Sequence, residues 1–138
     1  MEYKHNELTE KIIECFYKVY NNLGYGFIEK VYERAMVIEL KRINMFVISQ
    51  PQLFVYYDNG EQIGDFNCDL LVENTVIVEL KAKSKIIEDF EAQLLNYLNS
   101  SDYEVGLLLN FGVKPEVKRK IYDNDLKKWK QMTRIKNR

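Results

Sequence analysis

The run TVIVELK, residues 75–81, constrains the fold more than any other stretch of the chain. Its centre is apolar at successive positions, which is typical of a strand buried on both faces of a sheet. The run nevertheless ends in Glu79 and Lys81. Moving an ionised carboxylate into an apolar interior costs several kcal/mol unless the charge is paired or binds a metal ion. The sequence therefore predicts a charged site at the end of a buried strand.

The surrounding pattern predicts an α/β fold. Apolar positions with a 3.6-residue period indicate helices at residues 6–22, 28–44 and 87–99. Apolar runs and turn residues indicate strands at residues 46–49, 52–57, 64–72, 75–81 and 104–110, with an edge strand at 117–122. This order predicts a central mixed β-sheet flanked by helices. We expect residues 1–138 to form a single domain, because this length suits one hydrophobic core.

Composition limits the classes of function. The sequence has no run of about 18 apolar residues, and its N-terminal stretch is acidic and helical in pattern. These features predict a cytoplasmic protein without a membrane span. Cys15 and Cys68 are too few for a disulfide framework or an iron–sulfur cluster, so we expect buried free thiols. His5 is the only histidine in the sequence, which argues against histidine-based catalysis.

Charge is distributed unevenly along the chain. Residues 1–113 contain ten Lys and Arg against 18 Asp and Glu, whereas residues 114–138 contain ten against three. The basic end could contact a polyanion, with Tyr122 and Trp129 available for stacking. The alternative is a solvated basic tail over about residues 124–138. The candidate nucleic-acid contacts are Lys118, Arg119, Lys120, Lys127, Lys128 and Lys130.

Strand alternation decides whether the acidic residues can meet. Side chains alternate between the faces of a strand, so Glu79 and Lys81 share one face. Asp69, on the preceding strand, lies opposite Glu79 only if Val72 pairs with Val76 across a three-residue loop. A two-residue turn would move Asp69 to the other side. Two carboxylates this close repel each other unless a cation lies between them, and oxygen ligands suit a divalent ion such as Mg²⁺.

Four motifs carry a resemblance to a known family. Asp69 and the triplet Glu79-Leu80-Lys81 resemble the D...ExK core of the PD-(D/E)XK nuclease superfamily. GFIEKVY, residues 26–32, is similar to the GxxExxY signature that names one family within it. QLLNY, residues 93–97, resembles the QxxxY element of RecB-like nucleases. LLLNFGVKPEVKRKI, residues 107–121, resembles the usual ending of the family.

The resemblance implies a restriction-endonuclease-like fold and a metal-dependent nuclease. DNA is the expected substrate, and a metal-activated water is the expected attacking group. Asp69 and Glu79 would bind Mg²⁺ or Mn²⁺, and the backbone carbonyl of Leu80 would be an extra ligand. Glu29 would reach the same metal from its helix. Lys81 would position the attacking water and stabilise charge in the transition state.

Gln93 and Tyr97 are the remaining candidate catalytic residues, because they lie one helical turn apart and can share one face. From spacing alone, Gln93 is equally an ordinary polar helix position and Tyr97 a core aromatic residue. Glu29 is equally a glutamate favoured by the helix dipole. Phe90 stands where family members often have a histidine, so no role of that histidine is expected here.

Two functions from different classes stay open on the sequence. The first is a DNA nuclease. The second is a catalytically silent nuclease-fold protein that binds nucleic acid or a protein partner through its basic end, and a purely structural acidic pair is the simplest alternative. The sequence does not distinguish DNA from RNA or endonuclease from exonuclease action, and it leaves the oligomeric state open, a homodimer included.

Overall fold

The computed structural model describes residues 4–130. In this part of the chain the helices are α1 (Asn6–Leu23), α2 (Glu29–Arg42), α3 (Glu88–Asn99) and a short 3-10 helix, η1 (Asn124–Leu126). The strands are β1 (Val47–Ser49), β2 (Gln52–Tyr56), β3 (Gln62–Asn67), β4 (Leu70–Val72), β5 (Val76–Lys81), β6 (Val105–Phe111) and β7 (Pro115–Ile121). None of the helices in the described residues has the length and apolar content needed to cross a membrane.

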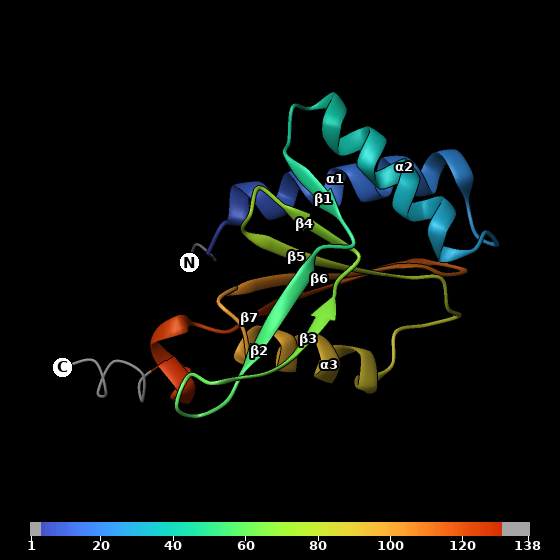
Figure 1. Ribbon diagram of the computed structural model, residues 1–138. Helices are drawn as coiled ribbons and strands as arrows, with labels where there is room; N and C mark the ends of the chain where they lie inside the picture. The colour runs from blue at the N-terminus through green and yellow to red at the C-terminus, as the bar shows by residue number, and fades with distance from the viewer. Residues whose placement is uncertain (1–3, 131–138) are drawn as a thin grey trace.

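The main sheet has the strand order β1-β4-β5-β6-β7 (Figure 1). β5 and β6 are parallel, and the other neighbouring pairs are antiparallel. β2 and β3 form a separate two-stranded sheet. α1 and α2 cover one face of the main sheet, and α3, the crossover between β5 and β6, covers the other (Figure 1). The predicted mixed sheet flanked by helices is therefore confirmed.

β5 forms the centre of both hydrophobic layers. Val76, Val78 and Leu80 pack towards α1 and α2, whereas Ile77 packs towards α3. All four side chains are almost completely buried, and burying an aliphatic side chain of this size contributes about 1.5–3 kcal/mol. Glu79 has the same strand parity as Ile77. The strand that holds the core together therefore also directs a carboxylate to the α3 side.

The β4–β5 hairpin has the register that the sequence analysis requires. Val72 pairs with Val76, which leaves the three residues 73–75 in the loop. Glu73 and Asn74 adopt positive φ angles of 53° and 49°, and the N–H of Thr75 donates to the carbonyl of Val72 at 3.0 Å. The predicted register is confirmed, and continuing the ladder by one pair places Asp69 opposite Glu79.

The predicted elements have ends within two residues of the observed ones, with one exception. The strand predicted at 64–72 is wrong, because the chain divides there into β3 and β4, which belong to different sheets. The break falls at Cys68 and Asp69. Cys68 is fully buried and its thiol donates to the carbonyl of Leu70 at 3.2 Å. Both cysteines are free and buried, as predicted.

The chain passes from one sheet to the other twice, and the two passages lie next to each other. The first passage, from β1 to β2, occurs at Gln50 and Pro51, and the second occurs at Cys68 and Asp69. The two passages are joined, because the N–H of Gln50 donates to the carbonyl of Asp69 at 2.9 Å. Asp69 therefore lies at the junction of the two sheets and belongs to neither β3 nor β4.

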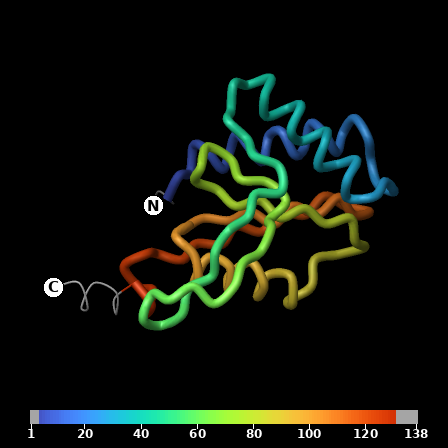
Figure 2. The backbone as a smooth tube through the Cα atoms, viewed as in Figure 1, coloured from blue at the N-terminus to red at the C-terminus, as the bar shows by residue number. Residues whose placement is uncertain are grey.

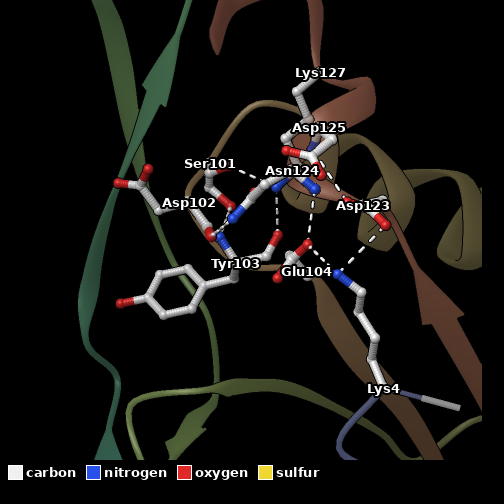
Figure 3. A network of polar contacts seen from close by, with 9 residues as sticks. All are labelled: Lys4, Ser101, Asp102, Tyr103, Glu104, Asp123, Asn124, Asp125 and Lys127. Carbon is white, nitrogen blue, oxygen red and sulfur yellow. Dashed lines mark hydrogen bonds and ion pairs between the residues drawn. The ribbon is translucent and has the colours of Figure 1, made fainter.

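The described part of the basic C-terminal segment packs against the residues that precede β6 (Figure 3). The ammonium group of Lys127 is buried and donates to the carbonyls of Ser101 and Tyr103 at 2.8 and 2.6 Å. The N–H of Asn124 donates to Glu104 at 2.8 Å. The rest of the predicted tail, residues 131–138, lies outside the described residues.

Candidate active site

Asp69 and β5 are joined directly at the junction of the two sheets. The N–H of Leu80 donates to Oδ2 of Asp69 at 2.6 Å. Because the N–H and C=O of one strand residue point to the same side of the strand, the carbonyl of Leu80 also faces Asp69. The structure thus brings together the carboxylate and the backbone carbonyl that the sequence analysis assigned to one metal.

Glu79 is a buried carboxylate with one unsatisfied oxygen. Only 9% of the residue is exposed. Among the described residues, Oε1 of Glu79 has no hydrogen-bond partner. Burial, and after it the charge of Asp69, raises the pKa of Glu79 to about 8, while Lys81 opposes the rise. Without a bound metal ion, Glu79 is therefore mostly protonated at neutral pH.

Asp69 is less deeply perturbed, because donors surround it. Burial raises the pKa of Asp69, and the hydrogen bonds from the N–H of Leu80 and the side chain of Gln50 partly offset that rise. Nε2 of Gln50 lies 3.3 Å from Oδ1 of Asp69. The two opposed carboxylates thus differ in environment, since Asp69 has two donors and Glu79 has an oxygen with none.

Glu33 and Gln50 belong to this site but were not among the predicted residues. Glu33 is buried and accepts hydrogen bonds from Nε2 of Gln50 at 2.5 Å and from Oγ of Ser49 at 3.1 Å. Its carboxylate also lies 3.5 Å from the ammonium of Lys30. Gln50 has a φ angle of 55°, which is uncommon for a residue other than glycine. The four-residue spacing from Glu29 could have revealed Glu33. Nothing in the sequence around Gln50 distinguishes it.

A cavity of about 190 Å³ lies beside Asp69, and Glu79 is not one of its lining residues. It is lined by Glu29, Lys30, Glu33, Gln50, Asp69 and Leu80. A larger hollow of about 590 Å³ lies by His5 and Glu73, near the hairpin end of β5 and away from the acidic pair. The smaller cavity is the better candidate for chemistry, because it gathers carboxylates from α2 and from the β3–β4 junction.

Glu29 is held at this cavity by the turn that precedes it. The hydroxyl of Tyr32 donates to the carbonyl of Gly24 at 2.6 Å. The Tyr32 ring stacks on Phe111 of β6, with centroids 4.1 Å apart and planes 11° apart. Gly26 has a φ angle of 121°, which residues other than glycine rarely adopt. The glycine and the tyrosine of GFIEKVY therefore fix the position from which Glu29 begins α2.

The donor set at the cavity suits a hard divalent cation. Within residues 4–130 no group of three or more His, Cys, Asp or Glu side chains is arranged to hold a metal ion. Asp69 lines the cavity, and Glu79 lies close enough for the charge of Asp69 to raise its pKa. Among the described residues, one oxygen of Glu79 is buried without a hydrogen-bond partner. Mg²⁺ needs only one or two protein carboxylates, because water completes its shell. The residues present therefore fit such an ion.

A family model described as the PD-(D/E)XK nuclease superfamily matches residues 6–120, from α1 into β7. The chain belongs to the PD-(D/E)XK nuclease superfamily. Searches of curated proteins and of solved structures found no match to the chain. Membership indicates a nuclease, a hydrolase whose substrate is nucleic acid, and nucleases of this superfamily generally use divalent metal ions. The mixed sheet and its helices agree with a restriction-endonuclease-like fold, so the predicted fold is confirmed.

Lys81, the last residue of the superfamily triplet, lies beside Glu79 on the same face of β5. Its ammonium is 4.7 Å from the centroid of the Phe90 ring, which is a cation–π geometry. Phe90 directly precedes Glu91-Ala92-Gln93, the position at which the family resemblance predicts a histidine. In this member of the superfamily, the aromatic ring therefore holds the ammonium of Lys81 next to the carboxylates.

Tyr97 and Gln93 of α3 differ in their relation to the site. Tyr97 stacks on Phe66, with ring centroids 3.8 Å apart. Burial, and after it the charges of Glu79 and Asp69, raises the pKa of the Tyr97 hydroxyl, so Tyr97 lies within electrostatic reach of both carboxylates. Gln93 is exposed one turn earlier, and no hydrogen bond in the described part of the chain joins it to either carboxylate.

The basic residues of β7 that were predicted to contact nucleic acid are divided between the two faces of the sheet. Arg119 points to the α1 side, where it bonds to Oγ1 of Thr9 at 3.3 Å and to the backbone carbonyl of Lys4. Lys120 points to the α3 side and lies 2.9 Å from Glu91. Lys118 is exposed. These three residues therefore do not form one continuous basic stripe.

The predicted contacts in the C-terminal segment are also largely engaged. Lys127 is buried, and that burial lowers the pKa of its ammonium to about 8, so it is withdrawn from any surface contact. Lys130 lies 2.6 Å from Asp102. Trp129 stacks on Tyr56 at 4.7 Å and donates to the carbonyl of Asn99. Within this described segment, Lys128 is the exposed member of the predicted set.

Proposed function

We propose that the protein is a nuclease of the GxxExxY family, in the RecB-like branch of the superfamily, that hydrolyses phosphodiester bonds of DNA with Mg²⁺ or Mn²⁺. The observation that carries the proposal is the buried Oε1 of Glu79, which has no hydrogen-bond partner among the described residues and belongs to a carboxylate within electrostatic reach of Asp69. Burying such an oxygen costs free energy unless a hydrogen-bond donor, a proton or a cation reaches it, and a divalent ion would supply the cation. The GFIEKVY and QLLNY sequences support the narrower family assignment.

Asp69 and Glu79 would hold the ion, with the carbonyl of Leu80 and the carboxylate of Glu29 as further ligands. A bound divalent ion would lower the pKa of a coordinated water and so supply a nucleophile at neutral pH. Lys81, held by the Phe90 ring, would stabilise negative charge that develops on the phosphate. Tyr97 would border the site from α3, with Gln93 one turn earlier on the same helix.

Charge balance supports the need for a cation. The three candidate carboxylate ligands carry three negative charges when ionised, against the single positive charge of Lys81. Glu33 does not change the sum, because it is paired with Lys30. A phosphodiester would be repelled by the ionised site alone, whereas one divalent ion brings the local charge to zero. Binding of the ion and of the substrate should therefore depend on each other.

A plasmid-nicking assay tests the proposal. We expect Glu79→Ala and Lys81→Ala each to lower the Mg²⁺-dependent nicking rate by at least about 100-fold, the scale of losing one transition-state stabiliser. Glu73→Ala is the matched control, since it removes an exposed carboxylate at the other end of the β4–β5 hairpin. Nicking that persists in both site variants would show that the assigned site is wrong. A parallel assay on RNA would decide between the two substrates.

A second candidate is a catalytically silent nuclease-fold protein that binds nucleic acid or a protein partner. The exposed Gln93, which makes no hydrogen bond to the carboxylates within the described residues, favours it. Calorimetric titration with Mg²⁺ and Mn²⁺ separates the two candidates. Heat of binding that disappears in Glu79→Ala supports the nuclease, whereas no binding of either ion by the wild type supports the silent protein.

A further inference from the structure

Three loops meet at one edge of the main sheet (Figures 1 and 2). They are the α1–α2 turn at residues 24–28, the β5–α3 loop at 82–87 and the β6–β7 turn at 112–114. The first of them leads directly into Glu29, which lines the acidic cavity. β5 and β6 are parallel, so their carboxyl ends both lie at this edge. We call these three loops together the carboxyl edge.

Direct contacts fix the three loops to one another. The hydroxyl of Tyr20, at the end of α1, lies 2.8 and 2.7 Å from the carbonyls of Gly112 and Val113. The side chain of Asn110 accepts the N–H of Lys83 at 2.9 Å and donates to the Lys83 carbonyl at 3.0 Å. A Cβ at Gly112 would lie 2.5 Å from that same carbonyl, so the two backbones are closely packed. The carboxyl edge is therefore a preformed surface.

The carboxyl edge carries three lysines, and carboxylates lie close by, because Glu116 accepts the N–H of Ile86 at 3.0 Å and the loop leads into Glu88 and Asp89 of α3. Lys83, Lys85 and Lys114 are exposed. The ion pairs found within the described residues include none of these three lysines, although they include Lys120 and Lys130. Exposed lysines that take part in none of these ion pairs, beside a carboxylate site, suit a polyanionic chain that must pass over that site.

The same edge exposes aromatic rings. Tyr25 is 55% exposed and Phe27 is 47% exposed, and both precede Glu29 by only a few residues. One edge of the Phe27 ring packs against Tyr32, with centroids 6.0 Å apart and planes 84° apart. This contact anchors Phe27 while much of its surface stays accessible. Exposed aromatic rings and lysines on one surface are the groups with which proteins bind unpaired bases and their phosphates.

We propose that the carboxyl edge binds single-stranded nucleic acid, with Lys83, Lys85 and Lys114 on phosphates and Tyr25 and Phe27 stacked on bases. The inference rests on the proposed function and adds the strand class that the site accepts. Bases in a duplex are paired and stacked on each other, so these rings have access to base faces only in a single strand. The surface is continuous with the site, because residue 28 precedes Glu29 and residue 82 follows Lys81.

Fluorescence anisotropy with a labelled 12-nucleotide single strand tests this surface, using the full chain in EDTA so that no strand is cleaved. Each phosphate contact to a single strand contributes about 0.7 to the slope of log K against log salt. The double variant Lys83→Ala/Lys85→Ala should therefore lower the slope by about 1.4. The matched control, Lys11→Ala/Lys41→Ala, removes two exposed lysines far from the edge and should leave the slope unchanged.

The aromatic contact has its own test. Tyr25→Ala should weaken single-strand binding by about tenfold, the lower range of losing one stacked base, whereas Tyr25→Phe should bind like the wild type. Equal affinity for a 12-base-pair duplex and the single strand would overturn the assignment of strand class. A slope lowered by Lys118→Ala/Lys128→Ala, and not by the loop variant, would overturn the assignment of the surface.

The binding assay and the nicking assay fail independently. Single-strand binding that depends on Lys83 and Lys85 in a protein that never nicks DNA would refute the proposed function and keep the binding surface. Nicking that depends on Glu79 but does not change in the lysine and tyrosine variants would refute the binding surface and keep the proposed function. Circular dichroism of each variant confirms that these exposed substitutions leave the fold intact.

Discussion

Replacing Glu79 by Gln should stabilise the metal-free protein at alkaline pH. The pKa of Glu79 is raised from 4.5 to about 8, so the folded protein binds this proton more tightly than the unfolded chain does. The stability that comes from this proton is complete below about pH 4.5 and is lost as the pH rises through 8. Over that interval the loss amounts to roughly 5 kcal/mol, at 1.36 kcal/mol for each pKa unit. This is a large part of the stability of a small domain.

Urea unfolding in EDTA at pH 5 and pH 9 measures this loss. The unfolding free energy of the wild type should fall by several kcal/mol more than that of Glu79→Gln, which cannot ionise at this position. Glu73→Gln, in the exposed hairpin loop, is the control and should follow the wild type. Mn²⁺ added at pH 8 should restore stability to the wild type but not to Glu79→Gln. Parallel pH profiles for the wild type and Glu79→Gln would refute the reasoning.

Further substitutions test the packing and the site. Gln50→Ala removes the amide that orients Asp69 and should weaken Mn²⁺ binding about tenfold by calorimetry, as loss of a group supporting a ligand does; unchanged affinity would exclude that role. Gly106→Ala should lower the unfolding free energy by about 1–3 kcal/mol in urea, because the new methyl would lie 2.7 Å from Leu94. Lys127→Ala leaves two carbonyls without a donor and should cost about 1–3 kcal/mol in the same assay; a stabilised variant would contradict the observed contacts.

The main sheet was predictable because its strands obey simple periodicities. The alternation through residues 76–81 placed Val78 and Glu79 on opposite faces, and the short loop fixed the hairpin register. The transfer between sheets at Cys68 and Asp69 was not predictable, because apolar and polar residues continue to alternate through it. A buried thiol and a bend interrupt the strand there without any glycine or proline to mark the break.

The site residues were predictable only where they belong to a recognisable sequence motif. Asp69, Glu79 and Lys81 stand at spacings that identify them, whereas Gln50 comes from a passage between sheets and reaches its partners through tertiary contacts alone. The burial of Lys127 in the basic C-terminal segment was not predictable for a related reason. Charge counted along the chain does not indicate that Lys127 folds inward onto backbone carbonyls.

The stack of Tyr32 on Phe111 makes the placement of Glu29 a property of two distant segments. The heptapeptide GFIEKVY supplies Gly26 with its positive φ angle, the carboxylate of Glu29 and the ring of Tyr32. β6 supplies Phe111, on which that ring stacks. Transplanting the heptapeptide into an unrelated helical hairpin should therefore transfer the sequence but not the position of the glutamate side chain. To place the glutamate as in this protein, the graft would also need an aromatic residue at the end of a neighbouring strand, on which the tyrosine could stack.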